Sequence, residues 1–286
     1  MAKLSNPSVI KDVLARYGFN FSKALGQNFL IDGSVCPRMA ASCGADSDTG
    51  VIEIGPGIGV LTAELAKTAN KVAAVELDER LRPVLAETLS EYDNVSVIFG
   101  DAMKLDLNEL IKREFPGQEV CVCANLPYYI TSPVLMKLLE SKLPLKSIAV
   151  MVQKEAAQRI CALPGTRECG AISIAVHYYS EPEVLFQVSR NSFMPPPNVD
   201  SSVIRLSLRK EPPVQVTDEE WFFKVSRAAF AQRRKTVVNS VSSVLKLPKS
   251  KTEQAILEMG LSKTVRAEQL QMEHFAGLSN RLFGLA

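Results

Sequence analysis

The 286-residue sequence predicts an α/β domain built on an open, mostly parallel sheet, followed by a small all-helical domain. Short β-branched runs alternate with segments of helical spacing through most of the chain. A glycine-rich turn directly follows the first of these runs. After residue 210 the strand-like runs end and only helical patterns follow. We therefore expect an α/β domain at residues 1–210 and a helical domain at residues 211–286.

The composition is that of a soluble globular protein with a full core. Hydrophobic residues make up 47% of the chain and charged residues 22%. A net charge of +2 is too small to indicate nucleic-acid binding by itself, so any basic surface must come from local clustering. We find no signal peptide and no apolar run long enough to span a bilayer. We expect a cytoplasmic protein that binds no membrane, and nothing demands more than a monomer.

Six cysteines and two histidines form no metal-binding pattern. No C-x-x-C pair is present, so we expect no metal site. Cys121 and Cys123 alternate onto one face of a strand expected at residues 120–124, where thiols pack as core residues.

The N-terminal segment predicts a short amphipathic helix within residues 3–20, which Gly18 ends. Residues 23–32 follow with a mixture of polar and apolar residues and no clean period. They form either a packed arm or a lid over a ligand, with Gln27 and Asn28 as its polar contacts. The sequence leaves both interpretations open.

A strand, a glycine turn and a helix are predicted at residues 51–66. The β-branched run 51–54 leads directly into Gly55-Pro56-Gly57-Ile58-Gly59. Glycines let the backbone approach a ligand closely, and the following helix presents its N-terminus. The next strand, 72–75, ends in Glu76, about twenty residues past the first glycine, where such folds hydrogen-bond a ribose diol. The combination predicts a cofactor that contains a nucleoside.

The spacing of the glycines indicates which cofactor the chain binds. A dinucleotide fold has its third glycine three residues after the second, where this chain has Val60. The E-x-G-x-G-x-G spacing of residues 53–59 is typical of S-adenosylmethionine enzymes. A third strand at 95–99 leads to Asp101, which suits an adenine amino group or, alternatively, a helix N-cap. We favour binding because Asp101 is the third polar group at successive strand ends.

The fourth polar group opens the stretch Asn125-Leu126-Pro127-Tyr128, which follows the strand at 120–124. The side-chain carbonyl of Asn125 and the backbone carbonyl of Leu126 suit the two N–H donors of an exocyclic amino group, and Tyr128 offers a ring for stacking. Such a tetrad resembles that of amino-methyltransferases acting on adenine N6. The alternative is an ordinary Asn-x-Pro loop between a strand and a helix.

Beyond the tetrad, the apolar pattern predicts a helix at residues 134–139 and a fifth strand at 147–152. Strand character returns at residues 183–188 and 199–208. Each of these segments extends the predicted α/β domain.

Between the last two strands, three successive prolines at 195–197 stiffen a loop that begins at Phe193. Phe193 is either a core residue of a rigid crossover or a second aromatic wall for a flipped base, opposite Tyr128.

A linker at residues 210–213 precedes the helical domain. Helical patterns follow at residues 221–230, 236–245, 252–259 and 267–276. Between the first two, Arg233, Arg234 and Lys235 form a compact basic cluster. Beside a domain that handles adenine, such a cluster suggests contacts with RNA phosphates.

Together these motifs resemble the KsgA family of rRNA adenine N6,N6-dimethyltransferases over essentially the whole chain. The matching stretches are residues 25–30, 53–59, 76, 100–101, 125–129, 153–155, 193–200 and 229–236. The glycine loop is common to many methyltransferases, whereas the stretches at 25–30, 125–129 and 193–200 are more specific. The chain departs from the family at Cys169, where a tyrosine is expected, and this puts one local contact in doubt.

The resemblance implies the fold of class I S-adenosylmethionine-dependent methyltransferases, which is Rossmann-like with a seven-stranded, mostly parallel sheet. It implies cofactor contacts at Asn28, Leu30, Gly55, Glu76, Asp101 and Asn125. It also implies the substrate, two adjacent adenines in the 3′-terminal hairpin loop of 16S rRNA in the immature small ribosomal subunit, each methylated twice. The helical domain would bind the maturing particle.

Three alternatives remain. An Erm-type enzyme acting on one adenine of 23S rRNA shares the fold and the tetrad, but the Phe193 loop and the long basic helical domain argue against it. A non-catalytic RNA-binding assembly or transcription factor is disfavoured because Glu53, Glu76, Asp101 and Asn125 are all intact. A nicotinamide dehydrogenase is disfavoured by the glycine spacing.

Overall fold

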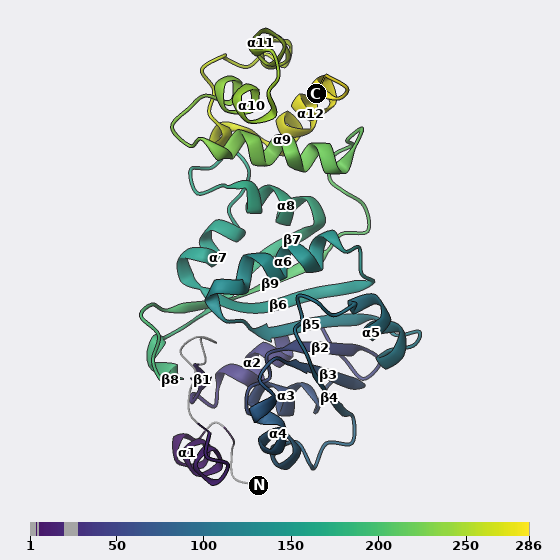
Figure 1. Ribbon diagram of the computed structural model, residues 1–286, viewed down its shortest axis with the longest axis vertical. Coiled ribbons are helices and arrows are strands. Elements are labelled where there is room, and N and C mark those ends of the chain that lie inside the picture. The colour runs from purple at the N-terminus through teal and green to yellow at the C-terminus, as the bar shows by residue number, and fades with distance from the viewer. Residues whose placement is uncertain (1–3, 5, 20–27, 286) are drawn as a thin grey trace. The chain divides into compact units, whose positions relative to one another are not determined.

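The computed structural model describes residues 4, 6–19 and 28–285, and its largest element is a seven-stranded sheet (Figure 1). In the order in which they pair, the strands are β4 (Val95–Phe99), β3 (Lys71–Glu76), β2 (Gly50–Ile54), β5 (Val120–Asn125), β6 (Leu145–Gln153), β9 (Ser201–Leu208) and β7 (Ser180–Val188). The first five run parallel, and β9 is antiparallel to β6. The predicted α/β class and the mostly parallel, seven-stranded sheet are confirmed.

The parallel register brings four strand ends to one edge of the sheet. Glu53 of β2 lies opposite Ala74 of β3 and Cys123 of β5, and Glu76 lies opposite Phe99 of β4. The chain order reverses at β2, because β3 and β4 extend the sheet on one side and β5 and β6 on the other. Open α/β sheets bind their ligands at such a switch point, outside the carboxyl ends of the strands.

The helices that accompany the sheet are short. They are α1 (Pro7–Arg16), α2 (Val35–Ser42), α3 (Val60–Leu65), α4 (Arg82–Thr88), α5 (Leu107–Glu114), α6 (Thr131–Glu140) and α7 (Lys154–Ile160), with 3₁₀ turns η1 (Glu79–Leu81), η2 (Tyr128–Ile130) and η3 (Arg190–Ser192). A separate two-stranded ladder joins β1 (Phe29–Leu30) to β8 (Phe193–Met194).

The predicted N-terminal helix is α1, and side chains at its end fasten it to α4. Asn6 caps its start by accepting a hydrogen bond from Ser8 N at 3.0 Å. At the other end, Arg16 donates two hydrogen bonds to the Glu87 carboxylate, at 3.0 and 2.7 Å, and Tyr17 donates a third at 2.7 Å. Burial of Ile10 and Leu14 in an apolar cluster completes the attachment.

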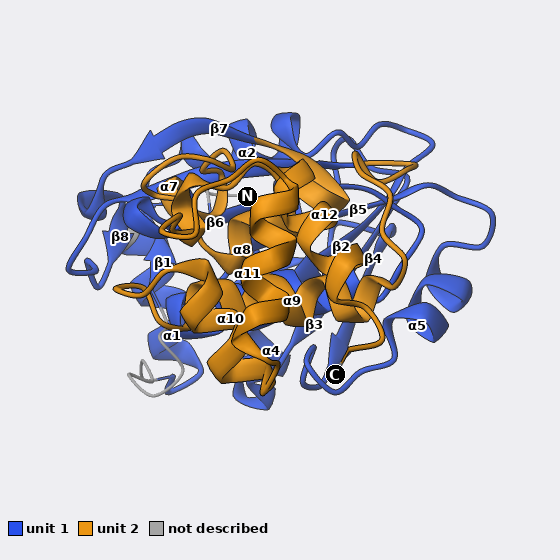
Figure 2. Cartoon of the chain, turned by 90° about the horizontal axis from the view of Figure 1, so that it is seen from above, with its two compact units in different colours: residues 1–157, 183–208 blue, residues 158–182, 209–286 orange. Residues whose placement is uncertain are grey.

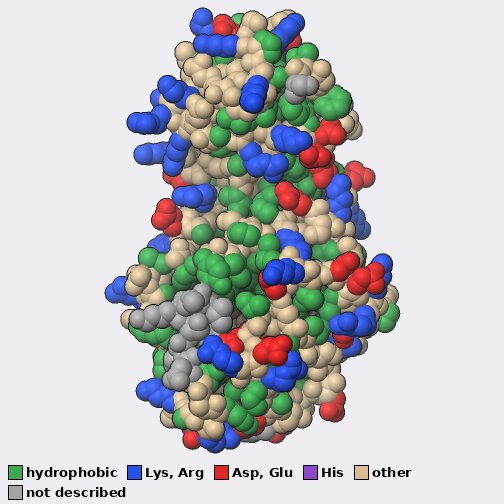
Figure 3. Space-filling view, viewed as in Figure 1, with side chains coloured by type: hydrophobic (Ala, Val, Ile, Leu, Met, Phe, Trp, Pro, Cys, Tyr) green, Lys and Arg blue, Asp and Glu red, His purple; other side chains and the backbone are tan. Residues whose placement is uncertain are grey.

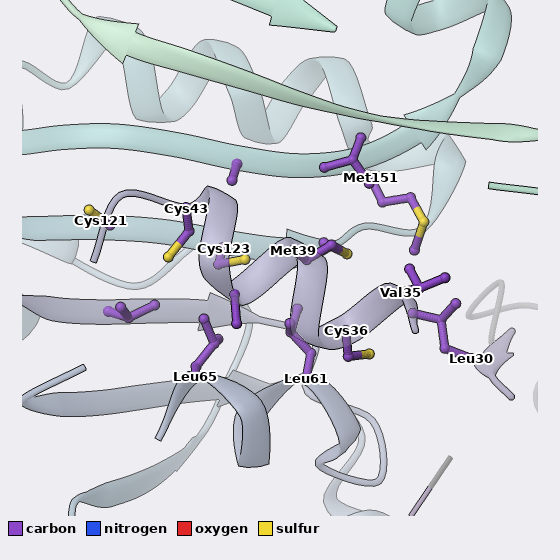
Figure 4. Close-up of a cluster of buried hydrophobic side chains, with 14 of the residues drawn as sticks. Leu30, Val35, Cys36, Met39, Cys43, Leu61, Leu65, Cys121, Cys123 and Met151 are labelled. Atoms are coloured by element: carbon purple, nitrogen blue, oxygen red, sulfur yellow. The ribbon is translucent and has the colours of Figure 1, made fainter. Parts of the chain in front are cut away.

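Several sulfur-containing side chains lie in the buried cluster that includes residues of β5 (Figure 4). Cys121 and Cys123 are fully buried there, as their alternation predicted, together with Cys43 and Met39 of the neighbouring α2 segment. The hydroxyl of Ser147 donates to the carbonyl of Cys43. Burial raises the pKa of Cys121 to about 11, so this thiol stays protonated and packs as a small apolar group.

The described chain divides into two compact units (Figure 2). The described residues within 1–157 and 183–208 form the first unit, and those within 158–182 and 209–286 form the second. Most of the second unit follows residue 209, close to the predicted linker at residues 210–213. The unit also includes residues 158–182, an earlier segment that contains α8 (Ala171–Tyr179). Aromatic packing explains the addition, since the Tyr178 ring lies 5.1 Å from that of Phe222 and 5.2 Å from that of Phe223.

The second unit is helical, as predicted. Besides α8 it contains α9 (Glu219–Ala231), α10 (Val237–Leu245), α11 (Lys249–Glu258), the 3₁₀ turn η4 (Ala267–Gln269) and α12 (Met272–Leu282). The prediction of a single helix at residues 267–276 is wrong for its first half. The helical pattern is interrupted there because Gln271 N donates to His274 Nδ1 at 3.1 Å, and this cap starts a new helix at Met272. Among the described helices, none has both the length and the hydropathy needed to cross a bilayer.

A substitution at Gly50 tests how closely Phe115 packs against the sheet. A Cβ atom added there would lie 2.2 Å from Cδ1 of Phe115, whose side chain is fully buried. We expect Gly50→Ala to lower the free energy of unfolding by roughly 1–3 kcal/mol through overpacking. Thermal unfolding of the full chain measures the effect. The control is Gly170→Ala, whose nearest neighbour would be 4.0 Å away; equal stability of the two variants would contradict the packing described.

Candidate active site

A cleft of about 1180 Å³, partly open to solvent, lies at the carboxyl ends of β2, β3, β4 and β5. That volume includes open solvent in front of the cleft. Nine residues singled out in the sequence line it together: Asn28, Leu30, Gly55, Glu76, Asp101, Asn125, Leu126, Tyr128 and Phe193.

The glycine loop after β2 forms one wall of the cleft. Gly55 has φ +74°, and a Cβ added there would meet nothing within 4 Å, so its backbone borders open space. Gly57 has φ +60°, and its Cβ would lie 2.8 Å from Cε1 of Phe29. The first glycine thus leaves the backbone accessible to a ligand, and the second allows the Phe29 ring to rest on the loop.

Glu53, at the end of β2, is a buried acid in the wall of the cleft. Its side chain is 1% exposed, and its Oε2 has no hydrogen-bond partner among the described residues. Burial raises its pKa to about 8, and the nearby charge of Glu76 also raises it. A buried acceptor without a partner is costly, so this oxygen is suited to receive a donor from a ligand.

Glu76, at the end of β3, accepts two backbone hydrogen bonds. Gly57 N donates to its Oε2 at 3.1 Å and Asp78 N to its Oε1 at 2.8 Å. Burial raises the pKa of Glu76, and these two hydrogen bonds oppose that rise. Each carboxylate oxygen has lone pairs left after these bonds, enough to accept two neighbouring hydroxyl groups.

Asp101, at the end of β4, stabilises the turn that follows it. Its Oδ1 accepts a hydrogen bond from Met103 N at 2.9 Å, so the alternative role as a backbone cap is present in part, although the next helix has Asp106 as its N-cap. The cleft wall beside it contains Ala102, Met103 and Leu77. Leu77 was missed in the sequence, where the available signal was a large apolar residue directly after a strand-terminal acid; its side chain is 52% exposed.

The Asn125 tetrad occupies the end of β5. The Asn125 side chain makes no hydrogen bond to any other described residue, so its carbonyl is available to a ligand. The side chain of Leu126 is buried, which anchors the loop and fixes its backbone carbonyl. The hydroxyl of Tyr128 shares a 2.8 Å hydrogen bond with Ser201 Oγ, and burial raises the pKa of Tyr128. Ser201 was also missed, because 73 residues separate it from Tyr128.

The N-terminal arm and the Phe193 loop meet in the β1–β8 ladder. Leu30 pairs with Phe193, and Ser192 Oγ donates to Asp32 Oδ2 at 3.1 Å. Phe193 is 3% exposed and packs in the core with Leu30, so the core interpretation describes most of its ring, although the residue also lines the cleft. Leu25, Gly26 and Gln27 of the predicted arm lie outside the described residues.

The chemistry of these groups fits S-adenosylmethionine. The unpaired oxygen of Glu53 suits an ammonium group, and the lone pairs of Glu76 suit a ribose diol. Asp101 and the apolar wall beside it suit an adenine ring with its amino group. Within the described part of the chain, no group of three or more His, Cys, Asp or Glu side chains could hold a metal ion.

The basic cluster lies in the second unit, in the turn between α9 and α10. Arg233, Arg234 and Lys235 are all exposed, and none pairs with an acidic side chain among the described residues. Figure 3 shows Lys and Arg side chains gathered along one edge of this unit. Cys169, the departure from the family pattern, is buried in the same unit, and burial raises the pKa of its thiol to about 11.

The raised pKa of Glu53 makes stability depend on pH. The folded state holds this proton up to about pH 8, whereas the ordinary pKa is 4.5. The contribution of Glu53 to the free energy of unfolding is therefore fully present below pH 4.5 and falls as the pH rises toward about 8. Because Glu53→Gln cannot ionise, we expect it to gain stability relative to the wild type across that window, by on the order of a few kcal/mol.

Urea unfolding at several pH values between 5 and 9 measures this difference. The control is Glu109→Gln on α5, where the carboxylate is exposed and, within the described part of the chain, pairs only with Lys112. A constant stability difference between Glu53→Gln and the wild type at all pH values would contradict the buried, neutral state of Glu53.

Comparison with known proteins identifies the family. Residues 18–283 match the model described as Ribosomal RNA adenine dimethylase. The chain is 52% identical to Ribosomal RNA small subunit methyltransferase A of Geobacillus thermodenitrificans over 286 residues, covering 99% of this chain and 98% of the relative. The protein of the same name from Bacillus mycoides is 51% identical with the same coverage.

Two solved structures resemble most of the chain. A dimethyladenosine transferase from Plasmodium falciparum has a TM-score of 0.71 and 26% identity, covering 87% of this chain and 95% of its own. The 23S rRNA methyltransferase ErmE has a TM-score of 0.69 and 27% identity, covering 89% and 99%. The expected class I methyltransferase fold is thereby confirmed, and a nicotinamide dehydrogenase is excluded. The chain belongs to the ribosomal RNA adenine dimethylase family, whose methyl donor is S-adenosylmethionine.

Proposed function

We propose that this protein dimethylates, at N6, two adjacent adenines in the 3′-terminal hairpin loop of 16S rRNA in the immature small ribosomal subunit. Asn125, Leu126 and Tyr128 lie in the same cleft as Glu53 and Glu76, and this position supports the proposed function. Identities of 51–52% to relatives named for the small subunit, against 27% to an enzyme named for 23S rRNA, favour the small subunit as the substrate.

The first group of side chains would hold the cofactor. Asn28, Leu30, Gly55, Glu76 and Asp101 line the cleft around the ends of β2, β3 and β4. S-adenosylmethionine, when bound, supplies an electrophilic methyl group on a sulfonium. The protein therefore needs neither to activate a leaving group nor to supply a nucleophile of its own, and its task is to present the target nitrogen in line with that methyl group.

Asn125 and Leu126 would prepare the target amino group. The N6 lone pair of adenine is delocalised into the ring, which makes the nitrogen a poor nucleophile. Two acceptors, the Asn125 side-chain carbonyl and the Leu126 backbone carbonyl, can receive its two N–H bonds and favour a more pyramidal nitrogen. This arrangement frees the lone pair toward the methyl carbon, and it is catalysis by position and electrostatics.

Tyr128 would hold the target base after it leaves the RNA stack. Stacking of a base on an aromatic ring contributes about 1–3 kcal/mol. The bond between Tyr128 and Ser201 Oγ fixes the orientation of this ring. Phe193 would contribute the opposite wall with the part of its ring that borders the cleft.

Deprotonation needs no dedicated base in this scheme. As the amino nitrogen bonds to the methyl carbon, the bond from that carbon to sulfur would break and leave its electron pair on sulfur as a neutral thioether. The amino nitrogen is then positively charged and acidic, and it releases a proton to water. The monomethylated base then has one N–H left. The second round therefore uses one acceptor fewer and requires space for the first methyl group.

The second unit would bind the ribosomal particle through its basic turn. Arg233, Arg234 and Lys235 are exposed and unpaired with acids among the described residues, so they are available for RNA phosphates. In this proposal the protein acts as a monomer in the cytoplasm, where the small subunit matures.

Transfer of labelled methyl groups from S-adenosylmethionine to undermethylated small subunits tests the function, with large subunits in parallel and nucleoside analysis of the product. We expect dimethyladenosine in the small-subunit rRNA alone. Label confined to the large subunit would show an Erm-type enzyme, and cofactor binding without transfer to either subunit would point to a non-catalytic assembly factor.

Removal of the Asn125 side-chain acceptor should lower the rate of methyl transfer much more than it lowers the affinity for the cofactor. We expect Asn125→Ala to lower turnover by at least about 100-fold, since one oriented polar group commonly contributes that much, while the Kd for S-adenosylmethionine rises far less. The control is Asn108→Ala, an exposed asparagine on α5. Parallel losses of turnover and cofactor affinity would make Asn125 chiefly a cofactor ligand.

Neutralising the basic turn should change how salt affects RNA binding. On single-stranded RNA, each phosphate that a cation of the protein neutralises contributes about 0.7 to the slope of log K against log salt. We therefore expect the triple change Arg233→Gln, Arg234→Gln and Lys235→Gln to flatten the slope by about 2 for small subunits. Cofactor affinity should be unchanged. An unaltered slope would remove these three residues from the RNA-binding surface.

A further inference from the structure

Lys137 of α6 is a half-buried lysine whose ammonium, among the described residues, binds only backbone carbonyls. Its Nζ donates to the carbonyl oxygens of Ala102 at 3.0 Å, Met103 at 2.8 Å and Leu105 at 2.9 Å. An ammonium has three donors, so all three are used. Lys137 forms no ion pair with an acidic side chain in the described part of the chain. A surface lysine that only solubilises a helix would leave its donors to water.

The three carbonyls belong to the turn of residues 101–105. Asp101, Ala102 and Met103 of this turn line the cleft where the adenine of the cofactor is proposed to bind, and we call them the adenine wall. Asp101 holds the other side of this turn: its carboxylate accepts from Met103 N, and its carbonyl accepts from Lys104 N and Leu105 N, at 2.8 and 2.9 Å. The N–H groups of the turn thus point toward Asp101 and the carbonyls toward Lys137. Ala102 and Met103 line the cleft, so the geometry of this wall depends on both side chains.

Lys137 also connects this wall to the target-base side of the cleft. Helix α6 begins directly after η2, the turn that carries Tyr128. Val134, one helical turn before Lys137, lines the same cleft. The ammonium therefore joins two segments that are far apart in sequence, the turn after β4 and the helix that continues the Asn125 loop.

We propose that Lys137 is a positioning residue for methyl transfer. It holds the turn of residues 101–105 so that Asp101 and the backbone beside it recognise the adenine of the cofactor, and it keeps that wall in register with α6 and the Asn125 loop. The proposal rests on the cofactor site proposed above and adds the residue that fixes its geometry.

Replacement of Lys137 by methionine removes the three donors but keeps most of the apolar stem. We expect the Kd for S-adenosylhomocysteine to rise by at least about tenfold, because displacement of a binding wall by about 1 Å has effects of this size or larger. We also expect lower selectivity against S-inosylhomocysteine, in which the adenine amino group is replaced by oxygen. Lys137→Arg should not restore the wild type, since a planar fork cannot direct three donors to carbonyls that converge on one point.

The experiment is calorimetric titration of the full-length protein with both ligands. Lys112→Met on α5 is the matched control, because the Lys112 ammonium pairs with no described acidic residue other than the exposed Glu109. Asp101→Ala is the reference for impaired recognition of the amino group. In the Asp101→Ala background, Lys137→Met should cause no further loss of selectivity, because the two changes act on one contact.

Two results would overturn the proposal. The first is a Kd for S-adenosylhomocysteine within twofold of that of Lys112→Met, and the second is an additive loss of selectivity in the double variant. If Lys137→Met does not fold, Lys137→Arg carries the same two measurements. A wild-type protein that does not distinguish the two ligands would instead count against the role proposed for Asp101, and the Kd for S-adenosylhomocysteine would still decide the role of Lys137.

Discussion

The parallel pairing of β4, β3, β2 and β5 fixes the positions of the residues that form the cleft. These strands are held in register, and β2, β3 and β5 are buried along almost their whole length. A shift of one residue in any of them would turn its side chains to the opposite face. The register therefore fixes where each strand ends, and with it the place of Glu53, Glu76, Asp101 and Asn125.

Those four side chains give the cleft one chemical character, since all of them present acceptor oxygens. Partial compensation comes from within the protein, as Glu76 and Asp101 each accept backbone hydrogen bonds. Glu53 keeps an unpaired buried oxygen and Asn125 an unused amide. A ligand pair rich in donors, with an ammonium, ribose hydroxyls and two adenine amino groups, matches this set. The cleft is selective because its unpaired acceptor oxygens gain hydrogen bonds only from a ligand that brings such donors.

Much of this arrangement could be predicted from the sequence, because it depends on local signals. Each strand end is marked by an apolar run followed by a polar residue or a glycine, and the tetrad adds a proline that fixes its turn. Contacts between distant segments carry no such signal. Ser201 meets Tyr128 across 73 positions, and Lys137 meets the carbonyl of Met103 across 34. The β1–β8 ladder has two residues in each strand, too few for any periodicity. The inclusion of residues 158–182 in the second unit rests on aromatic contacts such as Tyr178 with Phe222, which only the fold reveals.

If the ends of β2, β3, β4 and β5 form one site, hydrogen exchange of the full-length protein with and without S-adenosylhomocysteine should show it. We expect joint protection of the backbone at residues 55–59, 76–78 and 101–105, with a smaller effect at 125–128 and none at the basic turn of residues 232–236. Protection confined to the glycine loop, or strongest in the second unit, would contradict a single cofactor site built across the ends of β2, β3, β4 and β5.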